Sequence, residues 1–147
     1  MKRLLLLLSS IAMLFGLSSC KTKQYAATAL PDKKIVFGKG GGFTGAVTEY
    51  ILLENAQLFE HPFLQDSLVT MEAMKKKTCK QAFKTLDKID KSKLGVQEPG
   101  NLYYFLHYHD GENHYETTWG AAKYTIDPEV KSIWDQLMAE INNPSKQ

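Results

Sequence analysis

Residues 102–119 read LYYFLHYHDGENHYETTW and contain the clearest fold signal in the chain. Two runs rich in aromatic residues, 102–109 and 114–119, flank the turn-forming stretch Asp110-Gly111-Glu112-Asn113. Aromatic side chains fit a pleated sheet, and Asp-Gly is a common turn between antiparallel strands. The stretch therefore predicts a β-hairpin, whose alternating side chains would place one apolar face toward a core.

The segments on both sides add further strands and two helices. Residues 34–37 and 46–53 have strand composition, residues 58–59 indicate a third strand, and residues 67–70 indicate a short edge strand. A first helix is predicted to begin near Thr78 as its N-cap, and a last helix to follow Asp127-Pro128. The expected fold is α+β, with a mainly antiparallel sheet of about four strands and two amphipathic helices in the order ββ(β)αββα.

The N-terminus has the features of a secretory signal. Met1-Lys2-Arg3 is cationic, residues 4–17 are almost wholly apolar, and small residues follow. The apolar run is shorter than the roughly 20 residues that a membrane-spanning helix needs. We therefore expect residues 1–19 to be a signal peptide.

Leu17-Ser18-Ser19-Cys20 resembles the lipobox of bacterial lipoproteins. The resemblance implies that signal peptidase II cuts before Cys20. It also implies that Cys20 carries a diacylglyceryl group on sulfur and an acyl chain, such as palmitate, on its new amino group. Several chains on one residue give a lasting membrane anchor. The sequence thus predicts a lipoprotein.

The predicted layout is a lipidated cysteine and tether at residues 20–33, a single domain at residues 34–142 and a polar tail at residues 143–147. Lys21 and Thr22 offer no acidic retention signal. The expected location is therefore the cell envelope, at the outer membrane and facing the periplasm.

Net charge excludes one class of partner. Of the 18 Lys and Arg residues, Lys2 and Arg3 lie in the predicted signal peptide, which leaves 16 against 16 acidic residues. A neutral chain lacks the basic footprint of a nucleic-acid-binding protein. One local exception is a row of lysines on the first predicted helix, which fits either anionic lipid headgroups or an ordinary solvated face. Its members are Lys80, Lys84, Lys88 and Lys91.

The sequence does not predict an enzyme. With Cys20 lipidated, Cys79 is the remaining cysteine, and its place on the apolar side of a helix favours a small buried side chain over a nucleophile. No serine lies in a Gly-x-Ser-x-Gly elbow. Residues 40–45 formally fit G-x-G-x-x-G, but a strand rather than a helix is expected to follow, so a nucleotide site is not predicted.

Three histidines of the hairpin form a candidate metal site. A four-residue loop would place His109 opposite His114, whereas a two-residue turn would place His107 opposite His114; either register leaves the three on one face, near Glu116. Imidazoles grouped in this way suit zinc or copper. The same pattern fits a polar, solvent-facing hairpin tip.

From Lys34 onward, the chain resembles the emfourin family of small bacterial proteins, some of which inhibit thermolysin-like metalloproteases. The resemblance is carried by an opening strand that runs into Gly41-Gly42-Phe43-Thr44-Gly45, a strand with Tyr50, a middle helix, the Tyr-rich hairpin and the closing helix. It implies that the glycine loop and Phe43 bind a partner, a metalloprotease being one. An insertion-like stretch at residues 60–77 and the lipid anchor depart from the family pattern.

Two functions follow as hypotheses. The first is a membrane-anchored, non-enzymatic binding or accessory lipoprotein, with protease inhibition as one form; its partner-binding residues are Gly41, Gly42, Phe43, Thr44 and Gly45. In this hypothesis Phe43 is exposed at a loop tip, whereas a tight hairpin with Phe43 in the core would leave no such surface. The alternative is a metal-binding envelope lipoprotein that uses His107, His109 and His114.

Overall fold

A computed structural model describes residues 23–143. The predicted signal peptide, Cys20 and most of the polar tail lie outside the described residues. Among residues 23–143, no helix is both long enough and apolar enough to cross a membrane.

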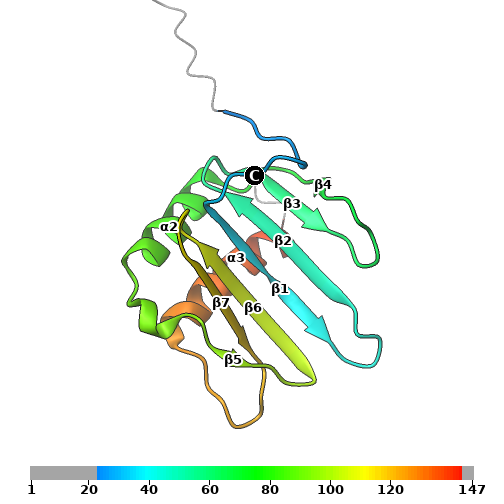
Figure 1. Cartoon of the computed structure of the whole chain (residues 1–147), viewed down its shortest axis with the longest axis vertical. Coiled ribbons are helices and arrows are strands. Elements are labelled where there is room, and N and C mark those ends of the chain that lie inside the picture. The colour runs from blue at the N-terminus through cyan, green and yellow to red at the C-terminus, as the bar shows by residue number, and fades with distance from the viewer. Residues whose placement is uncertain (1–22, 144–147) are drawn as a thin grey trace, which may run out of the picture.

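One mixed sheet forms the centre of the fold, in the order β4-β3-β2-β1-β6-β7-β5 (Figure 1). All neighbouring strands are antiparallel except β5 and β7. The α+β prediction is confirmed. The strands are β1 (Lys34–Gly41), β2 (Val47–Leu53), β3 (Leu58–His61), β4 (Val69–Thr70), β5 (Gln97–Glu98), β6 (Leu102–His109) and β7 (His114–Trp119).

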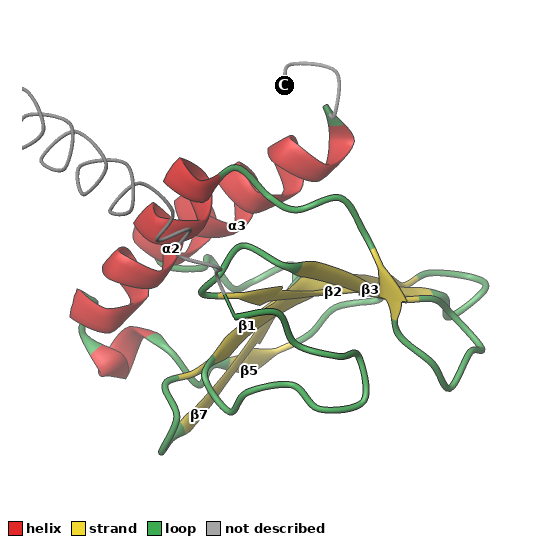
Figure 2. Cartoon of the chain, turned by 90° about the horizontal axis from the view of Figure 1, so that it is seen from above, coloured by secondary structure: helices red, strands yellow, loops and turns green. Residues whose placement is uncertain are grey.

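Helices α2 (Lys76–Lys88) and α3 (Pro128–Asn142) cover one face of this sheet (Figure 2). A short 3-10 helix, η2 (Lys91–Lys93), follows α2. The main core lies between the sheet and the two helices, because alternate strand residues and the apolar helix stripes meet there. Its fully buried members include Ile35, Phe37, Leu52, Leu106 and Tyr108 from the sheet and Leu86, Val130 and Leu137 from the helices.

The sheet has more strands than the sequence predicts, and β1 is longer. The expected first strand ended at Phe37, but β1 continues through the glycines to Gly41. The reason is a close approach that only glycine allows: a Cβ on Gly38 would lie 2.0 Å from the carbonyl oxygen of Thr48 and 2.8 Å from the Phe105 ring. The Phe105 ring thus lies against the bare backbone of β1.

The two helices differ in how well local sequence predicts their starts. α3 begins as expected, with the Asp127 carboxylate accepting a hydrogen bond from the Glu129 amide at 2.9 Å. α2 begins at Lys76, so the prediction of Thr78 as N-cap is wrong. The free end of α2 is instead bound by α3: Glu140 accepts from the Lys75 amide at 2.8 Å and from the Thr78 hydroxyl at 2.6 Å.

Part of the predicted tether packs on the other face of the sheet. Tyr25, Ala27 and Leu30 contact a second, smaller core cluster formed by Val36, Ile51, Leu53, Phe59 and Phe105. Gln57 binds the backbone of Tyr25 twice, accepting from its amide at 2.8 Å and donating to its carbonyl at 3.1 Å. The chain is therefore already held against the domain at its first described residues.

Candidate functional site

Large apolar side chains are exposed at one end of the sheet. Phe43 lies in the β1–β2 loop, and Leu102 begins β6 opposite Gly41. Phe63 and Leu64 follow β3, whose last residue pairs with Glu49 near the start of β2, so their loop leaves the sheet at the same end (Figure 1). These four residues form the apolar rim. Large apolar side chains exposed at one end of a fold mark a candidate interaction site.

The loop that carries Phe43 is fixed by its backbone. The Gly42 amide donates to the Asn101 carbonyl at 2.8 Å, and the Gly45 amide donates back to the Gly42 carbonyl at 3.2 Å. Gly41, Gly42 and Gly45 all have positive φ, at 93°, 77° and 62°. Other L-residues adopt such values only at a cost. The glycines therefore shape a defined turn with Phe43 and Thr44 at its tip.

Phe43 is fully exposed. Of the two placements that the sequence left open, the structure has the exposed one. A phenyl ring left in water forgoes roughly 1.5–3 kcal/mol of burial free energy, which contact with a partner would recover. The sequence did not single out the other members of the rim.

A shallow hollow of about 410 Å³ lies beside the loop. Its walls come from Gly40 and Gly41 of β1, Leu102 and Tyr103 of β6, and Trp134 of α3. The floor is stiff, because Trp134 Nε1 donates to the Gly38 carbonyl at 3.0 Å and the Trp134 ring packs edge-on against Tyr104 and Trp119. A rigid hollow next to an exposed ring suits the binding of a preformed surface.

The three hairpin histidines lie on the outer face of the sheet, as predicted. His109 pairs with His114 and His107 with Glu116, which is the register of the four-residue loop. The His109 and His114 rings stack with their centroids 4.1 Å apart. Burial lowers the pKa of His107, and burial together with His114 and Lys34 lowers the pKa of His109. The buried Nε2 of His107 and Nδ1 of His109 have no hydrogen-bond partner within the described residues.

These histidines do not form the metal site that was considered for them. Across residues 23–143, no three His, Cys, Asp or Glu side chains come together so that they could hold a metal ion. The physical reason is the strand register. His107 lies two residues from His109 along β6, about 7 Å away, and its cross-strand partner is Glu116 rather than a third imidazole. The zinc or copper hypothesis is therefore not supported by the geometry.

Cys79 lies in the core, as the sequence predicted. Its thiol is buried and donates to the Leu53 carbonyl at 3.2 Å. Burial raises the pKa of this thiol to about 11, so it stays protonated at neutral pH. A buried, protonated thiol is a poor nucleophile.

No protein-family model and no curated protein matches this chain.

The glycine loop can be tested by two alanine substitutions that share a positive φ. Gly41→Ala is expected to lower the free energy of unfolding by roughly 3 kcal/mol or more, because the new Cβ would lie 2.1 Å from the Asn101 carbonyl oxygen. Gly45→Ala meets no atom within 4 Å and should cost about 1 kcal/mol. Urea unfolding followed by tryptophan fluorescence measures both. Equal losses would show that the contact with Asn101 does not shape the loop.

The half-buried His107 and His109 predict a pH dependence of stability. Their folded pKa values lie below the unfolded value of about 6.5, so the unfolded chain takes up protons first as the pH falls. The free energy of unfolding should therefore decrease from about pH 7 toward about pH 5. His107→Leu should make this slope shallower. Equal slopes in the wild type and His107→Leu would contradict this prediction.

Proposed function

We propose that this chain is a membrane-anchored lipoprotein of the bacterial cell envelope that binds a partner protein through its apolar rim, and that it is not an enzyme. The observation that carries the proposal is Phe43, fully exposed at the tip of a loop whose backbone is held by glycine geometry and hydrogen bonds. Aromatic side chains are among the residues that dominate binding free energy at protein interfaces, and a fixed loop presents this one to a partner.

The position of the rim also supports this proposal. Lys23, the first described residue, is bound by Asn55 in the β2–β3 turn, with a distance of 2.7 Å from Asn55 Nδ2 to the Lys23 carbonyl oxygen. That turn and the Gly41–Gly45 loop lie at opposite ends of the sheet, about 25 Å apart along β1. An anchor just before Lys23 would leave the rim facing away from the membrane.

The resemblance to the emfourins suggests the class of partner to test first, a thermolysin-like metalloprotease. Inhibition requires a rigid element that enters an active-site cleft without being reorganised, and the short glycine loop has this form. The hollow beside it would receive an apolar side chain from the protease surface. In this proposal the loop glycines set the conformation, and Phe43 supplies most of the binding free energy.

Protease binding can be tested with the chain from residue 21 onward, because Tyr25 and Leu30 belong to the packed domain. We expect inhibition of a thermolysin-like protease, and Phe43→Ala should raise the inhibition constant at least about 30-fold, as truncation of a central aromatic anchor typically costs roughly 2 kcal/mol or more. The matched control is Phe63→Ala, which removes another phenyl ring of the apolar rim, from the loop that follows β3.

Three outcomes separate the possibilities. Loss confined to Phe43→Ala supports the loop as the inhibitory element. Equal losses in both variants would indicate that the rim acts as a general apolar patch. No inhibition by the wild type would exclude this protease class and leave the partner to be sought elsewhere in the envelope.

The anchor is tested separately by Cys20→Ala. If Cys20 is the lipidation site, the variant should retain its signal peptide or lose its acyl chains, and it should no longer carry lipid label. Metabolic labelling with palmitate and detergent phase separation measure this directly. Cys79→Ala is the control for chance labelling of a thiol. Unchanged labelling of Cys20→Ala would refute the lipoprotein assignment.

A further inference from the structure

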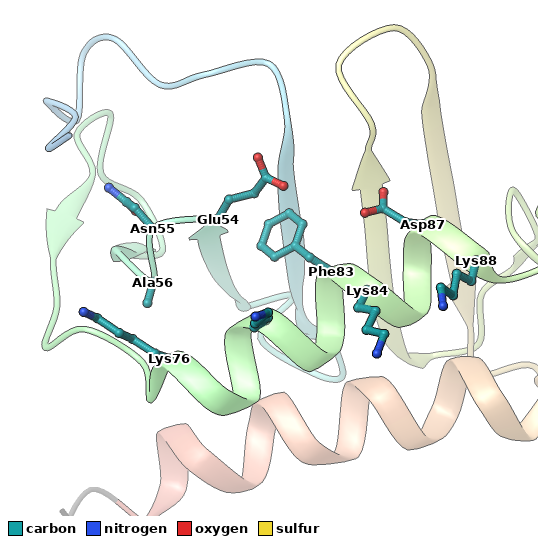
Figure 3. A pocket seen from close by; sticks show the side chains of 9 residues that line it. Glu54, Asn55, Ala56, Lys76, Phe83, Lys84, Asp87 and Lys88 are labelled. Atoms are coloured by element: carbon teal, nitrogen blue, oxygen red, sulfur yellow. The ribbon is translucent and has the colours of Figure 1, made fainter. Parts of the chain in front are cut away.

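The outer side of α2 has a dense positive charge that the neutral composition conceals. Five exposed lysines project from this helix, and we refer to them as the lysine face: Lys76, Lys77, Lys80, Lys84 and Lys88. Lys76 and Lys88 are about 18 Å apart along the helix axis. Between them, Lys80 and Lys84 continue the row at about one lysine per helical turn. Lys76, Lys84 and Lys88 are among the residues that line a hollow of about 490 Å³ next to the β2–β3 turn (Figure 3).

Nothing in the described fold neutralises this face. Within residues 23–143, none of its five lysines forms an ion pair. The carboxylates that border the hollows beside this face have other partners. Glu54 and Asp87 are bound to Lys33 at 3.0 and 3.1 Å, and Asp87 also accepts from the Tyr108 hydroxyl. Glu129 is bound to Lys93 at 3.0 Å. The acidic residues of the β6–β7 turn lie at the same end of the sheet, and Asp110 binds the amides of its own loop.

Local helix energetics do not explain the lysine face. Lys76 and Lys77 occupy the first turn of α2, which has no acidic residue, so they oppose the helix dipole. Lysines spaced four residues apart repel one another along the same side. Lys91, which the sequence grouped with this row, is directed elsewhere: it lies over the Tyr108 and Tyr115 rings. A set of charges that weakens its own helix points to an external anionic partner.

The position of the lysine face next to the N-terminus indicates what this partner is. Asn55 binds Lys23 and also lines the hollow that Lys76 borders. Cys20 precedes Lys23 by three residues, so the predicted lipid attachment lies within about 11 Å of Lys23. That reach is about one to two Debye lengths at physiological salt. The Lys76 end of the lysine face, which shares a hollow with Asn55, is therefore the part placed nearest the predicted membrane.

We infer that the lysine face lies on anionic lipid headgroups of the membrane that holds Cys20. This inference rests on the proposed lipid anchor and adds an orientation to it: α2 faces the bilayer, and the apolar rim points away. The lipids recognised are those with phosphate headgroups and a net negative charge, such as phosphatidylglycerol. Each lysine near such a surface contributes about fivefold to partitioning.

The test uses the non-lipidated chain from residue 21 onward, which contains every residue of the described fold, so the result does not depend on processing at Cys20. Sedimentation with vesicles measures its partitioning. We expect binding to vesicles that contain phosphatidylglycerol, little binding to phosphatidylcholine alone, and weakening by salt. Lys80→Glu/Lys84→Glu should lower partitioning at least about 25-fold.

The matched control is Lys39→Glu/Lys123→Glu, which changes the net charge equally at two exposed lysines outside α2. It should retain most of the binding. Equal loss in both double variants, or equal binding to both kinds of vesicle, would overturn the inference. Tighter, equally lysine-dependent binding to duplex DNA would also overturn it, in favour of a general polyanion site. Phe43→Ala should not affect partitioning, so this test and the protease test fail independently.

Discussion

The pairing of β1 with β6 is the constraint on which the rest of this structure depends. β1 lies between β2 and β6: seven of its eight residues pair with β2, and all eight pair with β6. The contact with β6 joins segments more than 60 residues apart in the chain, and the rings of Phe105 and Tyr103 occupy the space where Gly38 and Gly40 have no side chain. Closing so distant a contact costs chain entropy, which the buried aromatic surface offsets.

The same pairing gives the domain two functionally distinct ends. At one end, the β2–β3 turn binds Lys23, which follows Cys20 by three residues in the sequence. At the other, β1 and β6 carry the glycine loop and Leu102. Because a sheet is stiff along its strands, the separation between the ends does not depend on the tether. The proposed anchor and the proposed partner surface therefore would not compete for the same space.

Charge distribution is more informative in this protein than net charge. Basic and acidic residues are equal in number once the predicted signal peptide is set aside, yet the carboxylates and lysines are unevenly placed. Lys33 binds both carboxylates beside α2, Lys93 binds Asp127 and Glu129 at the start of α3, and the α2 lysines are left without partners in the described fold. Screening limits the reach of these charges to about 10 Å, so position on the surface decides what they can bind.

The sequence by itself determined the features that depend on neighbours along the chain. The hairpin at residues 102–119, the α3 start at Asp127-Pro128, the α+β class and the burial of Cys79 all follow from local periodicity and capping. Other features were decided only by the tertiary structure. Among the elements, these are the passage of β1 through its glycines and the start of α2 at Lys76. Among the side chains, they are the exposure of Phe43, the separation of His107 from His114 and the position of Lys23 beside the lysine face. The histidine separation is set by the register of the four-residue hairpin loop. The others depend on contacts between residues far apart in sequence, such as Glu140 with Lys75 or Asn55 with Lys23, and no local pattern encodes such a contact.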